Sequence, residues 1–110
     1  MDCVFCKIVA GEIPSKKVYE DETVLAFYDI QPVAPVHILV IPKQHITGCG
    51  AITTENSAVI SHIFEVIAQV AKQEGITDFR VVSNQGEQAG QTVHHLHFHI
   101  LGGRTLKGMG

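Results

Sequence analysis

The stretch HHLHFHIL, residues 94–101, contains four of the seven histidines of the chain. Three of them, His95, His97 and His99, alternate with the apolar residues Leu96, Phe98 and Ile100. Successive side chains of a β-strand point to opposite faces, so this alternation predicts a strand over residues 93–101. We expect it to carry three imidazoles on one face and to bury its apolar side chains on the other.

The composition around this stretch is that of a folded protein. The chain has 110 residues, of which 45% are hydrophobic and 17% charged, and this predicts one globular domain over residues 1–110. A net charge of −3 gives no general attraction to nucleic acid or to an anionic membrane, so we expect neither as a partner. The apolar runs are too short to span a bilayer.

The start of the chain and its cysteine count point to one cellular compartment. No basic segment followed by a long apolar run opens the chain, so no secretory signal is expected. Three cysteines, an odd number, argue against a disulfide framework. We therefore expect a cytoplasmic protein.

The remaining patterns predict an α+β fold, with strands in an antiparallel meander and a helix between them. Thr53 or Thr54 is expected to cap that helix, and Gly75 to stop it. The predicted elements are a helix over 4–10, a hairpin over 17–30 turning at 20–22, a strand over 36–42, a helix from the cap to about Lys72, and strands over 79–84 and 93–101.

The helix that starts near residue 54 is apolar around much of its circumference. A surface helix normally needs one apolar stripe, so this one is expected to have two buried contacts. One is its own sheet, and the other is a second subunit. A second internal layer is the alternative, but few residues are left to build it.

Two chemistries call for a face of aligned imidazoles. Such a face can hold zinc, or one imidazole can act as a nucleophile beside its neighbours. A solvated polar face would instead favour Thr, Lys or Glu. The preceding loop, QGEQAGQT (85–92), favours phosphate chemistry, because glycines such as Gly86 and Gly90 let backbone N–H groups converge on an anion and Thr92 adds a hydroxyl.

The segment GQTVHHLHFHILGGR, residues 90–104, resembles the signature of the histidine triad (HIT) family. The segments VFCKIVAGEIPSKKVYEDETVLAFYDI, APVHILVIPKQHI and NQGEQAGQTV resemble that family in the same order. The trailing GGR is similar to the branch of nucleoside phosphoramidases and histidine triad nucleotide-binding proteins. The resemblance implies a five-stranded antiparallel sheet with two helices, and a homodimer whose sheets join into one.

The resemblance also assigns roles to the histidines. It implies that His97 is the nucleophile that attacks phosphorus and that His99 contacts and helps protonate the leaving group. His37 corresponds to the fourth family histidine, which supports the other three from the adjacent strand. His95 is the first histidine of the triad, and all four are candidate catalytic residues.

The same resemblance implies a nucleotide-binding site. Asp29 corresponds to the carboxylate that binds the ribose diol, and the residues at the loop and strand entry hold the region of the α-phosphate. Apolar side chains form the walls around the purine. The phosphate set is Asn84, Gly90, Gln91 and Thr92, and the purine set is Phe5, Ile8, Phe27, Ile30 and Leu39.

A separate set of residues matches members of the family that bind structural zinc. These members use two cysteines in a C-x-x-C pair and two histidines, and the corresponding residues here are Cys3, Cys6, His45 and His95. Two thiolates and two imidazoles suit tetrahedral zinc. The alternative is that the cysteines are small apolar residues one helical turn apart. No cofactor is expected to be needed for catalysis itself.

The leading hypothesis is a purine nucleotide-binding hydrolase. It would cleave the P–N bond of nucleoside 5′-phosphoramidates and act on related acyl and aminoacyl adenylates, through a nucleotidyl-histidine intermediate. One alternative is a dinucleoside polyphosphate hydrolase. Another is a dimeric nucleotide-binding scaffold with incidental slow hydrolysis. A zinc-storing protein is a further alternative, but that function would leave the loop at 85–92 unexplained.

Overall fold

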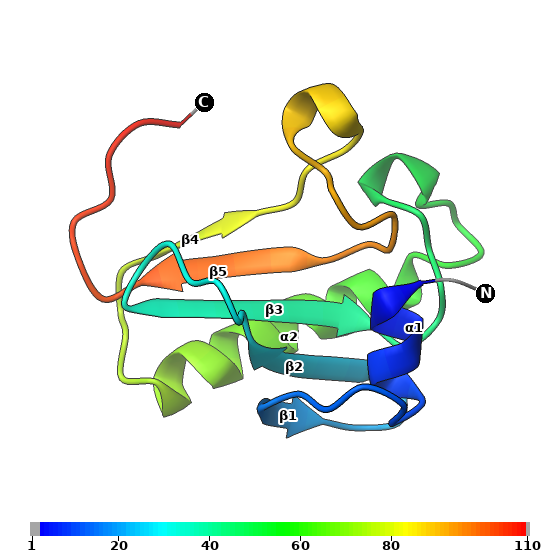
Figure 1. Ribbon diagram of the computed structural model, residues 1–110, viewed down its shortest axis with the longest axis horizontal. Helices are drawn as coiled ribbons and strands as arrows, with labels where there is room; N and C mark the ends of the chain where they lie inside the picture. The colour runs from blue at the N-terminus through cyan, green and yellow to red at the C-terminus, as the bar shows by residue number, and fades with distance from the viewer. Residues whose placement is uncertain (1–2, 110) are drawn as a thin grey trace.

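A computed structural model describes residues 3–109 (Figure 1). The elements are α1 (Val4–Val9), β1 (Lys17–Glu20), β2 (Val24–Tyr28), β3 (Val36–Pro42), η1 (Cys49–Ala51), α2 (Ala58–Gln73), β4 (Phe79–Val82), η2 (Glu87–Ala89) and β5 (Phe98–Gly102). The predicted five-stranded antiparallel α+β fold is confirmed. The sheet order is β1-β2-β3-β5-β4, so β5 lies between β3 and β4, and β4 forms one edge.

The sheet separates two apolar layers, because neighbouring residues of its strands face opposite sides. Figure 1 shows α2 behind the sheet and α1 in front of it. Leu25, Phe27, Leu39 and Ile41 pack with Phe5 and Ile8 of α1. The alternate residues of the strands pack with α2 in the larger cluster, which contains Val24, Ala26, Ile38, Val40, Phe98, Ile100, Ile63, Val66, Ile67 and Val70.

Helix α2 begins later than the predicted cap at Thr53 or Thr54. Its N-cap is Ser57, whose side chain makes no capping hydrogen bond. The residues before it form a turn in which the Thr53 N–H donates to Asn56 Oδ1 at 2.7 Å and Asn56 Nδ2 donates to the Ala51 carbonyl at 3.1 Å. Such local side-chain bonds compete with a helix, which explains the difference. The predicted stop at Gly75 is confirmed by its φ of +71°.

The strand predicted over 93–101 is shorter than expected, since β5 begins at Phe98. Val40 pairs with Phe98, and continuing this register would bring Leu96 opposite Pro42. Proline has no N–H for the ladder, so pairing stops there. The Leu96 N–H instead donates to the Ile46 carbonyl at 2.6 Å. The alternation of burial still holds, because Leu96, Phe98 and Ile100 all lie in the α2 layer.

The strand predicted over 79–84 is also shorter, because β4 ends at Val82. The hydroxyl of Ser83 donates to the His97 carbonyl at 2.8 Å, so a side chain replaces the ladder at this point. The other elements match their predicted ranges closely. Within residues 3–109, no helix combines the length and the apolar character that a membrane crossing requires.

Candidate active site

Three of the four predicted catalytic histidines come together, from β3, from β5 and from the position just before β5. The ring centroids of His97 and His99 are 5.0 Å apart, and those of His37 and His99 are 5.2 Å apart. His37 and His97 are buried, and His99 is partly buried. The sheet places His37 and His99 on the same face as α1, because their strand neighbours Ile38, Phe98 and Ile100 all face α2.

The nitrogen of His97 that can react is identified by its hydrogen bond. Nδ1 of His97 lies 2.6 Å from the carbonyl oxygen of His95, which can only accept, so Nδ1 carries the proton and donates. Nε2 of neutral His97 is therefore left with a free lone pair. The Phe5 ring meets the His97 ring edge-on, with centroids 5.1 Å apart, and helps to hold its orientation.

A second chain of hydrogen bonds fixes His99. The Val33 N–H donates to His37 Nδ1 at 3.1 Å, so the proton of neutral His37 lies on Nε2. His37 Nε2 lies 2.9 Å from His99 Nδ1 and donates to it. His99 therefore accepts at Nδ1 and presents an N–H at Nε2, the complement of the bare nitrogen of His97.

Burial favours the neutral forms of His37 and His99. Burial lowers the pKa of His37, although the nearby Asp29 carboxylate opposes the shift. Burial, with the neighbouring imidazoles of His97 and His37, lowers the pKa of His99 to about 4. Near pH 7 His99 of the free protein is therefore neutral, as its hydrogen bonds require.

Asp29 adjoins the triad just beyond the end of β2. Its Oδ2 lies 3.4 Å from His37 Nε2, and its Oδ1 accepts the Gln31 N–H at 2.7 Å. Asp29 also opens onto a cleft of about 570 Å³. The cleft lies between the connection from α1 to β1 and the end of β2, and it is lined by Pro14, Ser15, Lys16, Tyr28, Asp29 and Ile30.

The apolar residues assigned to the purine divide into two groups. Phe5, Ile8, Phe27 and Leu39 are buried together in the layer beneath α1. Ile30 lies apart from them, and 93% of its surface is exposed at the cleft beside Asp29.

The loop over residues 83–92 approaches the triad through Ser83 and the chain before β5. Gly86 and Gly90 have φ values of +88° and +99°, a conformation that favours glycine. A Cβ on Gly90 would also lie 3.4 Å from Asn84 Nδ2, so these two predicted phosphate ligands are neighbours. Thr92 is exposed at the end of the loop.

Gln91 is buried, and its amide is used within the protein. Its Oε1 accepts the Gly86 N–H at 2.8 Å, and its Nε2 donates to the carbonyls of Thr47 and Val93 at 2.8 and 3.2 Å. The side chain therefore braces the glycine loop from the inside.

The fourth triad histidine, His95, points to the other predicted cluster. Ligand atoms of Cys3, Cys6, His45 and His95 all lie within 4.8 Å of one another. Nδ1 of His95 is 3.3 Å from Cys3 Sγ and 3.2 Å from His45 Nδ1. Cys6 Sγ is 3.3 Å from His45 Nδ1 and 3.6 Å from His95 Nδ1.

These distances fit a tetrahedral zinc ion. Bonds of about 2.0 Å to nitrogen and 2.3 Å to sulfur at tetrahedral angles separate the ligand atoms by roughly 3.3–3.8 Å. His95 Nε2 donates to the Pro42 carbonyl at 2.8 Å, so Nδ1 presents the lone pair that a metal needs. The cluster joins α1 to the end of β3 and to the chain before β5.

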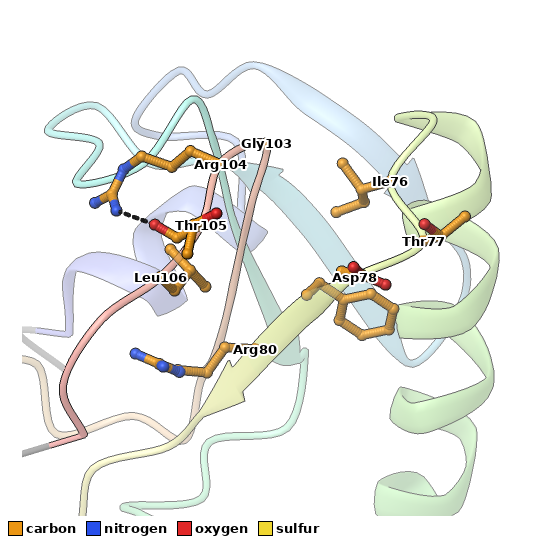
Figure 2. Close-up of a pocket in the computed structure, with 9 residues that line it drawn as sticks. Ile76, Thr77, Asp78, Arg80, Gly103, Arg104, Thr105 and Leu106 are labelled. Carbon is orange, nitrogen blue, oxygen red and sulfur yellow. Dashed lines mark hydrogen bonds between the residues drawn. The ribbon is translucent and has the colours of Figure 1, made fainter.

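A further cleft lies away from the histidines, beside the β4 edge of the sheet. Figure 2 shows it between residues 76–80 and 103–106, with the Arg80 side chain extending from β4 toward the latter segment. The Arg104 guanidinium donates to the carbonyls of Thr105 and Val33, both at 2.9 Å. None of the predicted site residues lines this cleft.

Sequence reasoning did not identify the groups that set the imidazole protons. The Val33 N–H and the carbonyls of His95 and Pro42 are backbone groups, which have no sequence signature. The Ser83 hydroxyl, which holds the His97 carbonyl, was part of a predicted strand. Only the three-dimensional structure shows these contacts.

Comparisons with known proteins agree with this geometry. The family model described as "Scavenger mRNA decapping enzyme C-term binding" matches residues 2–109. An uncharacterized HIT-like protein of Synechococcus elongatus is 51% identical, covering 96% of this chain and 93% of the relative. A 14 kDa zinc-binding protein of Zea mays is 48% identical, covering 94% of this chain and 83% of that protein.

Solved structures give the same result. A histidine triad protein from Clostridium difficile has a TM-score of 0.95 and 53% identity, covering 100% of this chain and 97% of the other. A HIT family hydrolase from Clostridium thermocellum has a TM-score of 0.95 and 45% identity, covering 98% and 96%. Sequence, fold and histidine geometry agree, and the chain belongs to the histidine triad (HIT) family.

Proposed function

We propose that this protein is a purine nucleotide-binding hydrolase that cleaves the P–N bond of nucleoside 5′-phosphoramidates and acts on the P–O bond of related acyl and aminoacyl adenylates. The observation that supports the proposal is the hydrogen bond from His97 Nδ1 to the His95 carbonyl, which leaves Nε2 with the free lone pair that a nucleophile needs. The similar structure from Clostridium thermocellum, described as a HIT family hydrolase, supports the reaction class.

The reaction has two steps. In the first, the Nε2 lone pair of His97 bonds to phosphorus, the P–N bond of the N-protonated phosphoramidate breaks, and its electron pair leaves with the neutral amine. His99 Nε2–H donates a hydrogen bond to the departing group. In the second, water attacks phosphorus and displaces the imidazole, which releases the nucleoside monophosphate and a proton to solvent.

The substrate is placed by groups around the triad. In this proposal Asp29 binds the ribose diol, and Asn84, Thr92 and the N–H groups near Gly90 hold the phosphate. Gln91 supports the loop instead of touching the ligand, because its amide is already bonded. The apolar layer beneath α1 forms the floor under the purine.

The test is a mass-resolved turnover assay with adenosine 5′-phosphoramidate and a diadenosine polyphosphate, side by side. We expect release of AMP from the phosphoramidate at the higher kcat/KM. His97→Ala should lower that rate by at least about a thousandfold, because no neighbouring side chain replaces the nucleophile. Comparable turnover of the phosphoramidate by His97→Ala would contradict the proposal.

We also propose that Cys3, Cys6, His45 and His95 hold a structural zinc ion. The donor set and its distances support this, and so does the similar zinc-binding protein of Zea mays. Bound zinc would supply cross-linking of α1 to the sheet, and no step of the reaction uses it. The ring of His95 then serves the metal while its carbonyl orients His97.

We propose further that two copies form a dimer through α2 and the β4 edge. Ile63, Val66, Ile67 and Val70 bury one face of α2 on its own sheet, whereas Phe64 on the adjoining face is 49% exposed. Phe79 on β4 is also exposed. An open strand edge beside exposed aromatic rings suits a continuous sheet across a two-fold axis.

A further inference from the structure

The turn that follows β5 contains the segment GGR, residues 102–104, and the proposed reaction gives its arginine no role. Gly103 has a φ of +91°, and a Cβ added to it would lie 2.9 Å from Pro35 Cβ. Because Gly103 has no side chain, the turn can lie directly against the loop between β2 and β3. Arg104 follows at this point of close approach.

The Arg104 guanidinium joins the turn to that loop. One of its terminal nitrogens donates to the Thr105 carbonyl at 2.9 Å (Figure 2), and the other donates to the Val33 carbonyl at 2.9 Å. The donors of a guanidinium are fixed in one plane, so a single side chain can hold both carbonyls at once. Arg104 therefore clamps the segment after β5 to Val33.

Val33 is held through its backbone and not by burial of its side chain, which is 62% exposed. Its N–H donates to His37 Nδ1 at 3.1 Å, and its carbonyl accepts from Arg104. Pro32 and Pro35, on either side of it, have no N–H with which to bind the loop to its neighbours. The orientation of Val33 therefore depends on these two hydrogen bonds.

We propose that Arg104 is a positioning residue for the reaction and that it acts on His37 through Val33. This inference rests on the proposed function, in which the Nε2–H of His99 donates to the leaving group. The Val33 N–H occupies His37 Nδ1, so the proton of neutral His37 lies on Nε2 and is donated to His99 Nδ1 at 2.9 Å. By holding the Val33 carbonyl, Arg104 keeps the Val33 N–H directed at His37.

Loss of this clamp allows the reverse arrangement of protons. If the Val33 N–H moves away, His37 Nδ1 is free to carry the proton of the ring. The bare Nε2 of His37 then accepts from His99 Nδ1, and His99 presents a lone pair at Nε2 in place of an N–H. Asp29 Oδ2, 3.4 Å from His37 Nε2, favours the original arrangement, so we expect a mixture of the two.

Nitrogen NMR of protein labelled at histidine observes this arrangement, because the protonated and bare nitrogens of a neutral imidazole resonate at different frequencies. At neutral pH the unaltered chain should show His37 with its proton on Nε2 alone. Arg104 is exposed, so Arg104→Ala should fold, and it should show a second population with the proton of His37 on Nδ1. The matched control, Lys107→Ala, removes an equal charge from the same exposed segment and should give the spectrum of the unaltered chain. An unchanged His37 signal in Arg104→Ala would overturn the proposal.

Steady-state kinetics test the consequence for the reaction. Arg104→Ala should lower kcat by about threefold to tenfold for an alkylamine phosphoramidate of adenosine, the effect of one weakened hydrogen bond. The kcat for an arylamine phosphoramidate should fall less, because an arylamine is the better leaving group. The Kd for AMP should not change. An unchanged kcat for the alkylamine, an equal loss for both amines or a weaker affinity for AMP would each contradict a role that acts through His37.

The two measurements also separate this inference from the proposed function. If the unaltered chain cleaves no phosphoramidate, the proposed function fails and the role of Arg104 in that reaction fails with it, whereas NMR still decides whether Arg104 orients His37. If the unaltered chain cleaves the phosphoramidate and Arg104→Ala retains both its kcat and the proton position of His37, the proposed function stands and the role of Arg104 alone is overturned.

Discussion

His37 Nε2 lies 2.9 Å from His99 Nδ1, across the pairing of β3 with β5. The Val33 N–H that donates to the other nitrogen of His37 fixes the direction of this hydrogen bond. His99 is thus left with an N–H at Nε2, while neutral His97 is left with a lone pair at Nε2. Two chemically identical side chains thus carry their protons on opposite nitrogens, His97 because of a backbone carbonyl and His99 because of the His37 side chain.

The first prediction concerns the leaving group. His99→Ala should lower kcat/KM by about 10²–10⁴-fold for an alkylamine phosphoramidate, and much less for an arylamine one. An alkylamine is the poorer leaving group, so it gains more from the N–H of His99. Steady-state kinetics over a series of amines measure this effect. The kcat/KM of His99→Ala should depend more steeply on the basicity of the amine than that of the unaltered chain. The matched control, His94→Ala, removes an exposed histidine and should leave the series unchanged. An equal loss for every amine would assign His99 to binding only.

The second prediction concerns metal. Protein purified without chelators should contain close to one zinc per chain, and Cys6→Ser should lose it, whereas Cys49→Ser, outside the cluster, should keep it. Occupancy should fall on acidification, because thiolates and imidazoles bind metal only when deprotonated. Elemental analysis at several pH values measures both effects. A metal-free unaltered protein would remove the zinc assignment and leave the catalytic one intact.

The third prediction concerns association. Phe64→Glu should convert the dimer to a monomer in sedimentation experiments at micromolar concentration, with the fold retained, because Phe64 is half exposed. Ile63 is a poor probe, since it is fully buried against the sheet and a charge there would unfold the chain. Gln69→Glu adds the same charge at an exposed polar position of α2 and should remain dimeric. A monomeric unaltered chain would contradict the proposed interface.

The fourth prediction concerns a contact between α2 and the first hairpin. His62 Nε2 donates to Asp21 Oδ2 at 2.5 Å, and Tyr19 OH donates to the same oxygen at 2.6 Å. The hydrogen bond to Asp21 raises the pKa of His62, and Glu65 adds to this shift. Hydrogen bonds from His62 and Tyr19 outweigh burial and lower the pKa of Asp21.

These shifts set the sign of the pH dependence. The stabilisation from His62 is fully present below its unfolded pKa and is lost as pH rises through the raised folded value. The stabilisation from Asp21 is present above its unfolded pKa and is lost as pH falls through the lowered folded value. The coupling in a His62→Ala, Asp21→Ala double-mutant cycle should therefore be larger at pH 5 than at pH 9. Urea unfolding at both values measures it, and a coupling that rises with pH would contradict the assignment.

The sequence allowed the topology and the histidine face to be predicted, because both depend on local periodicity. Alternation at residues 95–100 identified the side facing α2, and Pro42 marked the end of β3. The start of β5 could not be predicted, since it depends on the register that places Leu96 opposite Pro42. The late start of α2 likewise depends on the side chain of Asn56.

The candidate site shows the same division. Family motifs placed His37, His97 and His99 together, and the two cysteines with His45 and His95. No motif assigns imidazole protons, since these depend on the Val33 N–H and the His95 carbonyl. His62 and Asp21 are 41 positions apart, so no local sequence pattern predicts their contact. Whether the Ser15 hydroxyl has a hydrogen-bond partner depends on the residues packed around it, so the sequence does not predict that either.

The measurement that tests the central claim most directly is detection of the covalent intermediate. The chain is mixed with adenosine 5′-phosphoramidate, quenched within one turnover at neutral to alkaline pH, and analysed by intact mass and by peptide mapping. We predict an adenylyl group attached to Nε2 of His97 that forms and decays at rates consistent with kcat. His97→Gly, with imidazole added, should recover turnover without forming the adduct. An adduct on another residue, or turnover faster than the adduct decays, would contradict His97 as the nucleophile.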